Sequence, residues 1–265
     1  MINWLKDSIR RRIGFIPVLE WRNKILMAPA LPGTIRSEAR EVERLSRLLS
    51  DTRTKAKVAC VVPTYRRPER VVDAVQSILR QTFQDFVIIV VDDGGGLPDL
   101  PDDPRVVAVS LSQNVGIAGI VRNVGIRLSQ SEYIAFLDDD NTWLPQHLAL
   151  CLETLEAGHD LVYTAIARRT PSGRKLDVIS APFDRRTIIN DPYVDTSAIV
   201  VRRSDKVLFS RLPRGRSGQT LPGEDWEFVY RLSRGARVKH IPIVTVDYLV
   251  NPQSFYTPWG SDRAE

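Results

Sequence analysis

Three consecutive aspartates, Asp138, Asp139 and Asp140, directly follow the short apolar run 133–137. Such a run is typical of a buried strand, so the carboxylates are predicted at the strand's carboxyl end, where open α/β sheets bind ligands. Three adjacent carboxylates repel one another unless a positive group compensates them. A divalent cation takes oxygen ligands and bridges phosphates, so we expect a metal site here. An acidic turn that caps the following helix is the simpler alternative.

A second acidic pair, Asp92 and Asp93, ends the apolar run 86–91 and is followed by three glycines. In a parallel sheet both acidic clusters would lie at the same edge. An ionised carboxylate is a strong acceptor for a hydrogen bond from a base or ribose. The glycines let the backbone approach a ligand closely. Taken alone, however, the segment is better explained as a flexible turn.

The first predicted strand leads into Pro63, Thr64 and Tyr65, with Arg67 two positions further on. A strand that ends in this way can line a nucleotide pocket, where Tyr65 would offer a ring face and a hydroxyl. The same residues are also ordinary turn formers, so the signal is weak by itself. Arg122 lies in a predicted helix and could pair with a diphosphate. A solvent-exposed arginine at that position is nearly as good an interpretation.

Two carboxylates, Glu224 and Asp225, open a predicted helix, where the macrodipole favours negative charge. Capping of the helix is the commoner use of such residues. The preceding segment 211–220 is basic and contains glycine and proline, which predicts a mobile loop. A mobile loop that leads to a carboxylate is typical of a lid over a catalytic base.

Between residues 58 and 250 the chain alternates short apolar runs with helical patterns. This alternation predicts an α/β fold with a mainly parallel sheet flanked by helices. The predicted strands are 58–62, 86–91, 106–111, 133–137 and 161–167, with a hairpin-like stretch to 179, and the predicted helices are 68–81, 117–128, 145–156 and 225–233.

The basic residues are concentrated in an N-terminal extension, residues 1–57, which precedes the α/β domain at 58–250 and a tail at 251–265. The extension carries 13 Lys and Arg and 6 Asp and Glu, a net charge of +7, whereas the whole chain has +5. Helices are expected over 2–13 and 37–49, and prolines and a glycine interrupt the pattern between them.

Aromatic and basic residues around an apolar stripe make residues 1–27 a candidate interfacial helix on an anionic membrane. Packing of the extension on the α/β domain or on a second subunit is an equal alternative. Nucleic-acid binding is disfavoured because the basic residues alternate with large aliphatic ones. No apolar run approaches the ~20 residues that span a bilayer.

Other site types have little support. The two cysteines, Cys60 and Cys151, make neither a disulfide framework nor a metal site, and so favour a reducing compartment. We therefore expect a cytoplasmic protein, at most peripheral at the inner face of the cell membrane. The three histidines are scattered, and no Gly-x-Ser-x-Gly hydrolase motif is present.

Taken together, these segments resemble the family 2 glycosyltransferases of the GT-A fold, which is Rossmann-like. The matching segments occur in the family's order over roughly residues 58–235, and the first 57 residues and the tail after about 245 lie outside the match. Individually each segment is common, but seven in order are specific. They are Val61-Val-Pro-Thr-Tyr65, Ser77-Ile-Leu-Arg-Gln-Thr82, Val90-Val-Asp-Asp-Gly94, Asn114-Val-Gly116, Arg122-Asn-Val-Gly-Ile126, residues 133–140 and Gly223-Glu-Asp-Trp226.

The resemblance implies a nucleotide-diphosphate-sugar donor, most commonly a UDP-sugar, and Mg²⁺ or Mn²⁺. Asp138 to Asp140 look like the family's Asp-x-Asp metal signature, with Asp140 as a direct ligand and Asp138 as a metal residue that also lies near the ribose. The residues expected to bind the nucleotide sugar are Pro63, Thr64, Tyr65, Arg67, Asp92, Asp93, Arg122, Asp138 and Asp139.

The resemblance also implies an inverting transfer in which Asp225 is the general base and Glu224 lies beside it. The expected acceptor is a hydroxyl of a cell-envelope glycan or of a lipid-linked molecule. One departure concerns the metal, because many relatives carry a histidine in the C-terminal segment, and residues 247–252 have none.

Two other classes of function remain as alternatives. A sugar nucleotidyltransferase uses a related sheet and metal site, but it needs a glycine-rich triphosphate loop after the first strand, and 63–68 contains no glycine. A membrane-associated, non-catalytic sugar-nucleotide-binding module is the other, and the intact carboxylates argue against it.

Overall fold

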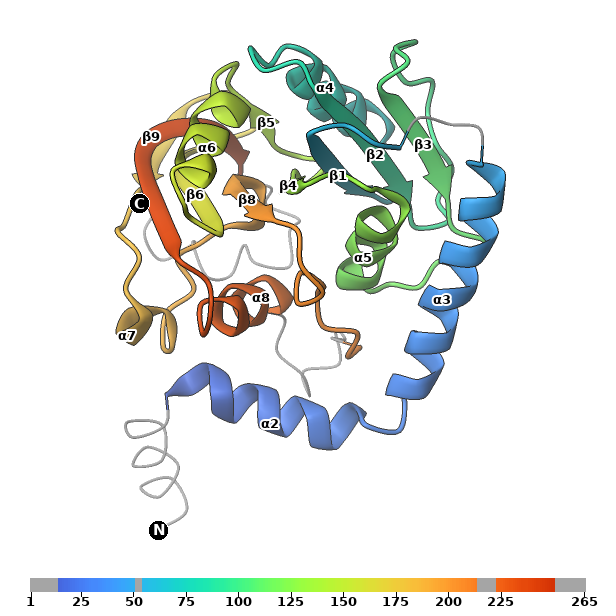
Figure 1. Cartoon of the computed structure of the whole chain (residues 1–265), viewed down its shortest axis with the longest axis horizontal. Helices are drawn as coiled ribbons and strands as arrows, with labels where there is room; N and C mark the ends of the chain where they lie inside the picture. Colours follow the sequence, from blue (N-terminus) through green and yellow to red (C-terminus); the bar gives the residue numbers. More distant parts are fainter. Residues whose placement is uncertain (1–13, 51–53, 214–222, 251–265) are drawn as a thin grey trace.

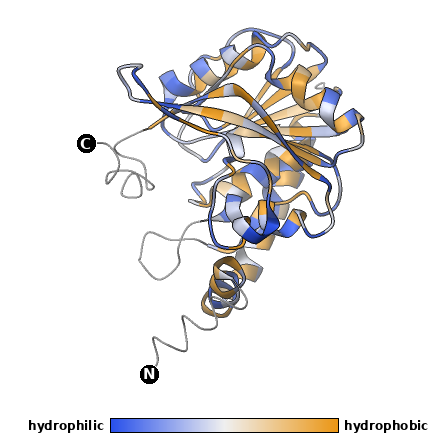
Figure 2. Cartoon of the chain, turned by 90° about the vertical axis from the view of Figure 1, so that its left-hand side faces the viewer, coloured by the Kyte–Doolittle hydropathy of each residue, from blue (hydrophilic) through white to orange (hydrophobic). Residues whose placement is uncertain are grey.

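The computed structural model describes residues 14–50, 54–213 and 223–250. Within this part, one nine-stranded sheet forms the centre of the molecule, and helices cover both of its faces (Figures 1 and 2). The predicted α/β class is therefore confirmed. The predicted helix over 2–13, the tail 251–265 and most of the expected lid lie outside the described residues.

The strands are arranged in the order β3-β2-β1-β4-β8-β6-β9-β5, and β7 pairs with β6. The first four strands of this order are mutually parallel, with Val58 opposite both Phe86 and Tyr133. Beyond β4 the sheet is mixed, because β8 runs antiparallel to both of its neighbours. The strands are β1 (Val58–Thr64), β2 (Phe86–Asp92), β3 (Val106–Ser110), β4 (Tyr133–Phe136), β5 (Thr142–Trp143), β6 (Leu161–Arg169), β7 (Lys175–Ile179), β8 (Ile199–Arg202) and β9 (Val238–Leu249).

Helices connect and cover these strands. Each predicted helix of the α/β domain is found, and its bounds differ from the prediction by no more than two residues. The helices are α2 (Phe15–Met27), α3 (Leu31–Leu48), α4 (Pro68–Leu79), α5 (Ala118–Leu128), α6 (His147–Glu156), α7 (Arg185–Ile188) and α8 (Glu224–Leu232), with a short 3₁₀ turn η1 (Thr196–Ala198) before β8.

The central strands are apolar along their whole length because both of their faces are covered. All residues of β2 and β4 are buried, and β1 is buried except for the half-buried Pro63. Removing these side chains from water is the main favourable contribution to folding. The polar residues that end these strands are therefore held on a rigid edge.

The described part of the extension contains α2 and α3, and α3 starts six residues before the predicted boundary at residue 37. Pro32 and Gly33 lie inside its first turn rather than breaking the helix. A proline there loses no hydrogen bond, because the first amides of a helix have no partner within the helix. The break falls instead at the turn between α2 and α3.

Helix α3 packs along α5, as Figure 1 shows on the right-hand side. Its Glu38 side chain is only 2% exposed. Arg211 donates two hydrogen bonds of 2.8 Å to this carboxylate, Arg127 donates one of 2.9 Å, and Asn123 donates one of 3.0 Å. This part of the extension is therefore built into the α/β domain. No helix in the described ranges is long and apolar enough to cross a membrane.

Acid should destabilise the fold through His147, a fully buried residue at the start of α6. Its ring stacks on Trp143 at 4.3 Å, and its Nδ1 contacts Thr245 Oγ1 at 2.7 Å. Because that hydroxyl donates to Thr164, the Nδ1–H of His147 must donate to Thr245. The other ring nitrogen, Nε2, is buried without a hydrogen-bond partner, and burial lowers the pKa of His147 to about 3.

In the unfolded chain His147 has its ordinary pKa of about 6.5, so it binds a proton below that pH. In the folded chain the same ring stays neutral, so the unfolded state binds one more proton. We expect the free energy of unfolding to fall by about 2 kcal/mol between about pH 7 and pH 5 through this residue. Urea unfolding of the wild type and His147→Gln across this range isolates the effect, because the variant lacks the titrating ring. His159→Gln is the matched control, because it removes a half-buried histidine just after α6 and leaves His147 in place. An equal pH dependence in His147→Gln would contradict the assignment.

Candidate active site

The three aspartates that follow β4 lie at the carboxyl edge of the parallel strands. Leu137 extends the pairing with β1 by one hydrogen bond, from its N–H to Val61 O at 3.1 Å, and the chain then leaves the sheet. Ser197 of η1 fixes this departure, because its hydroxyl accepts from the Asp138 N–H at 3.3 Å and from the Asn141 side chain at 2.8 Å. The predicted position of the acidic cluster is thus found.

Two of the carboxylates are held by groups from β1 and the loop after it. Thr64 Oγ1 and Arg67 Nη1 each donate to Asp139 at 2.8 Å. The same Arg67 nitrogen donates to Asp140 at 2.7 Å. Thr64 and Arg67, both predicted site residues, therefore belong to the acidic cluster.

Arg122 joins this cluster to helix α8. Its Nη2 donates to Asp138 at 2.5 Å, and its Nη1 donates to Glu224 at 3.4 Å. The side chain is only 7% exposed. Burial opposes its charge, but the carboxylates of Asp138, Glu224 and Asp225 outweigh burial and raise the pKa of Arg122. The alternative of a solvent-exposed arginine is therefore wrong.

Replacing Arg122 with methionine should lower the free energy of unfolding by about 3–5 kcal/mol, because it removes the cation from a buried ion pair and leaves the carboxylates. Urea unfolding measures the change. Arg237→Met is the matched control, since Arg237 is 69% exposed and pairs with Asp160 at the surface. That control should cost about 1 kcal/mol or less. Equal losses of unfolding free energy in the two variants would show that burial does not strengthen the contribution of the Arg122 ion pairs to stability.

The site carries more negative charge than its arginines neutralise. Burial, and then the charge of Asp138, raise the pKa of Asp140 to about 6 in spite of its contact with Arg67. Burial, followed by the charges of Asp138 and Asp225, raises the pKa of Asp195 to about 7. Burial and the same group of carboxylates also raise the pKa of Tyr248. Asp225 therefore lies electrostatically within one cluster with Asp138 and Asp140.

The sequence pattern does not predict Asp195 and Tyr248 as site residues, because neither residue ends one of the predicted apolar runs. Asp195 instead precedes one, because β8 runs antiparallel to β4 and brings its amino end to the acidic edge. Tyr248 is near the carboxyl end of β9, a strand that the sequence pattern does not predict. Asp195 caps η1, because its carboxylate accepts a hydrogen bond from the Ser197 N–H at 2.8 Å. An aspartate two positions before a serine is a pattern of such a cap that is visible in the sequence.

Asp92 and Asp93 hold turns with their carboxylates. Asp92 accepts from the N–H groups of Gly95 and Gly96 at 2.9–3.0 Å. Asp93 accepts from the backbone of Val115 and Gly116 at 2.7 and 2.9 Å and from the side chain of Asn114 at 3.3 Å. The two carboxylates stabilise the loops after β2 and β3, and their contact with a base or ribose stays a prediction.

The two remaining residues of the predicted nucleotide pocket lie at the end of β1. Tyr65 is 38% exposed, and the Arg66 guanidinium lies 5.1 Å from the centre of its ring. Pro63 is half-buried within the strand. Both residues are on the same edge as the acidic cluster, and the partial exposure of Tyr65 lets it contact a ligand.

The residues present fit a divalent cation only in part. In residues 14–50, 54–213 and 223–250, no group of three or more Asp, Glu, His or Cys side chains is arranged to hold a metal by itself. Mg²⁺, however, is often held by one or two carboxylates together with substrate phosphates. Asp138 and Asp140 form such a pair, and their mutual repulsion is what a cation would relieve. The pair therefore fits a metal that arrives with a phosphate-bearing ligand.

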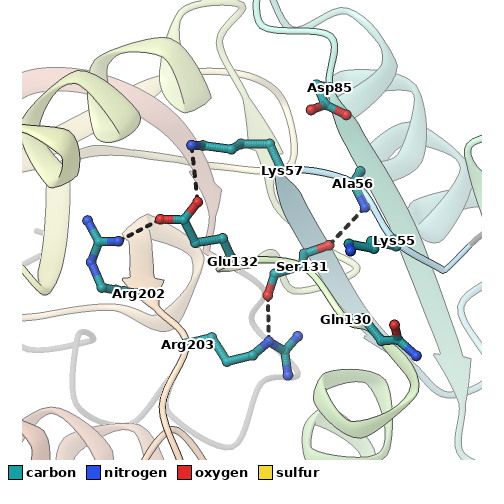
Figure 3. Close-up of a pocket in the computed structure, with 9 residues that line it drawn as sticks. All are labelled: Lys55, Ala56, Lys57, Asp85, Gln130, Ser131, Glu132, Arg202 and Arg203. Carbon is teal, nitrogen blue, oxygen red and sulfur yellow. Dashed lines mark hydrogen bonds and ion pairs between the residues drawn. The ribbon is translucent and has the colours of Figure 1, made fainter.

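A depression of about 790 Å³ lies at the opposite edge of the sheet, around the starts of β1 and β4 (Figure 3). Glu132 pairs there with Lys57 at 3.1 Å and with Arg202 at 2.6 Å. Arg203 donates to the carbonyls of Ser131 and Ile126. These charged groups hold one another and the strand ends, so the depression is a less suitable site for chemistry than the acidic edge.

Known proteins share this fold and part of this sequence. The solved structure "S. aureus TarS 1-349 in complex with UDP-GlcNAc" superposes with a TM-score of 0.58 at 17% identity, over 75% of this chain and 60% of that chain. That likeness confirms the GT-A-type fold.

Among curated proteins, the uncharacterised glycosyltransferase YwdF of Bacillus subtilis is 25% identical over 210 residues, which are 72% of this chain and 74% of YwdF. TuaG of the same species, a putative teichuronic acid biosynthesis glycosyltransferase, is 31% identical over 140 residues, or 49% of this chain and 55% of TuaG. WcaA of Escherichia coli, a putative colanic acid biosynthesis glycosyl transferase, is 34% identical over 102 residues, or 36% of each chain.

Residues 59–204 match the sequence profile of Glycosyl transferase family 2. This range is more than half of the chain and contains β1 to β8, with the three aspartates that follow β4. The chain belongs to glycosyl transferase family 2.

Proposed function

We propose that the chain catalyses an inverting transfer of a hexosyl group from a UDP-sugar to a hydroxyl of a cell-envelope glycan or a lipid-linked acceptor. The observation that carries this proposal is the bridge made by Arg122 between Asp138 and Glu224. The bridge holds the acidic cluster after β4 against the start of α8, where Asp225 follows Glu224. A donor at the aspartates would therefore lie beside a carboxylate that can accept a proton.

In this proposal Asp225 acts as the general base. The acceptor hydroxyl gives its proton to the Asp225 carboxylate while its oxygen attacks the anomeric carbon of the sugar. The bond from that carbon to the diphosphate breaks, and the diphosphate leaves with the bonding electrons. Attack from the side opposite the leaving group inverts the anomeric configuration.

Asp138 and Asp140 would hold Mg²⁺ or Mn²⁺ together with the donor. When bound, the cation supplies Lewis-acid stabilisation of the charge that develops on the diphosphate. Arg67 lies 2.7 Å from Asp140 and can offer a second positive charge to the same phosphates. Asp195 and Tyr248 face the same carboxylates and can bind hydroxyls of the transferred sugar.

The choice of donor and acceptor rests on relatives and neighbours. Solved structures of TarS with UDP and with UDP-GlcNAc support a uridine nucleotide. The curated names of TuaG and WcaA refer to biosynthesis of teichuronic acid and colanic acid, and so support a polysaccharide product.

A panel of nucleotide sugars, incubated with the full chain and Mn²⁺ or Mg²⁺ without acceptor, tests the proposal. A glycosyltransferase should slowly release UDP and free sugar from one donor, and calorimetry should show binding of that donor. A nucleotidyltransferase would instead convert the donor to a nucleoside triphosphate when pyrophosphate is supplied. Donor binding without any turnover, even with candidate acceptors, would indicate a non-catalytic module.

A further inference from the structure

The outer face of α2 is apolar although it is exposed. Trp21 is 67% exposed and Ile25 is 56% exposed, and they lie one helical turn apart on the same face. The opposite face packs Ile16 and Leu19 into the protein core. A helix that is apolar on both faces needs a second apolar environment besides the domain it packs on.

The exposed charges on α2 are both positive. Arg22 and Lys24 are exposed, whereas Glu20 is buried, 7% exposed, with the Asn23 side chain 3.5 Å away. At 3.6 residues per turn, Arg22 and Lys24 lie on the two sides of the stripe formed by Trp21 and Ile25. An apolar stripe flanked by cations is the arrangement of a helix that lies in the surface of an anionic membrane.

Helix α2 is also firmly attached beside the catalytic helix (Figure 1). The Phe15 ring stacks on Trp226 at 5.4 Å, and Trp226 follows Asp225 in α8. The Phe15 and Ile16 N–H groups both donate to Ile189 O at 3.0 Å. A surface bound by α2 would therefore be held at a fixed position relative to the start of α8.

The helix begins at a close approach that only glycine allows. Gly14 has φ 92°, and a Cβ at this position would lie 2.3 Å from the Ile189 side chain. The attachment of α2 to the segment around Ile189 is thus built into the sequence. Figure 2 shows α2 at the lower edge of the molecule, with much of its ribbon coloured as hydrophobic.

We propose that the outer face of α2, formed by Trp21, Arg22, Lys24 and Ile25, docks on an anionic lipid bilayer. Tryptophan favours the membrane–water interface, and each cation there gains from the negative surface potential. A symmetric contact with a second copy would instead bring the cations of both copies together. The docking goes beyond the proposed reaction and does not depend on it. Its consequence is that α8 works close to the membrane, where a lipid-linked acceptor would be met.

Flotation of the full chain with vesicles tests the proposal. The wild type should float with vesicles of phosphatidylglycerol and phosphatidylcholine, and much less with phosphatidylcholine alone. Trp21→Ser/Ile25→Ser should lower the affinity for anionic vesicles by about ten-fold or more, because two apolar side chains lose their burial. Arg22→Gln/Lys24→Gln should lower it by about ten- to thirty-fold and reduce its dependence on salt.

Leu48→Ser is the matched control, because Leu48 on α3 is 68% exposed. This variant should float as the wild type does. The proposal is wrong if the wild type does not float, if Leu48→Ser loses as much affinity as Trp21→Ser/Ile25→Ser, or if the latter floats normally. A wild type that is dimeric by light scattering, with Trp21→Ser/Ile25→Ser monomeric, would show that a second copy covers the face. Donor hydrolysis without vesicles, measured on the same proteins, reports separately on the proposed reaction.

Discussion

Replacing Asp225 with asparagine should lower the rate of sugar transfer by ~10²-fold or more, which is the usual scale for loss of a general base. The amide keeps the size of the side chain but cannot accept the acceptor's proton at neutral pH. Donor affinity should change little, because the nucleotide is expected at the residues after β1 and β4. Steady-state kinetics with a saturating donor, together with calorimetry of UDP binding, separate the two quantities.

The fold should tolerate this substitution. Asp225 is one of the charges that raise the pKa values of Asp195 and Tyr248. Neutralising it removes repulsion from these groups and also one attraction to the buried Arg122, so the free energy of unfolding should change little. Glu224→Gln is the control for the choice of base, since Glu224 contacts Arg122, and this variant should retain more activity than Asp225→Asn. The reverse order of activities would assign the base to Glu224.

Replacing Asp140 with alanine should abolish the dependence of donor binding on Mn²⁺ or Mg²⁺. Removing partners of metal ligands typically costs 10–100-fold in affinity, so loss of a direct ligand should reach about 100-fold. The measurement is calorimetry of UDP binding with metal and with a chelator. In the wild type the metal should strengthen binding, and in Asp140→Ala both conditions should give the weak, metal-independent affinity.

Asp139→Asn provides the comparison for this prediction. Asp139 is buried, with a side chain 7% exposed, and it accepts from Thr64 and Arg67. It is therefore placed to hold the loop rather than a cation, and its variant should keep the effect of metal on UDP binding. If the metal strengthens UDP binding equally in Asp140→Ala and in the wild type, Asp140 is not a ligand.

The α/β alternation and the place of the acidic cluster were predictable from local sequence. The runs that became β1, β2 and β4 are apolar throughout because both of their faces are covered, and such runs are visible without knowing their neighbours. The three aspartates follow one of these strands directly, so their position at the sheet edge followed from the strand alone. The sequence places Asp92 and Asp93 at the end of a strand but does not show what their carboxylates bind. In the structure they accept hydrogen bonds from the backbone N–H groups of residues 95, 96, 115 and 116.

The amino-acid sequence by itself determined which residues are buried in strands and which carboxylates end them, since these properties depend on neighbours along the chain. Only the tertiary structure decided that Arg122 would be buried between Asp138 and Glu224, which are 16 and 102 positions away. It also decided that Asp195 would join the site, because the antiparallel β8 brings its amino end to the acidic edge. Tyr248 reaches the same edge near the carboxyl end of β9, which is parallel to β6. Charge clusters of this kind depend on the direction and order of the strands in the sheet. Neither property can be predicted from the local pattern of residues.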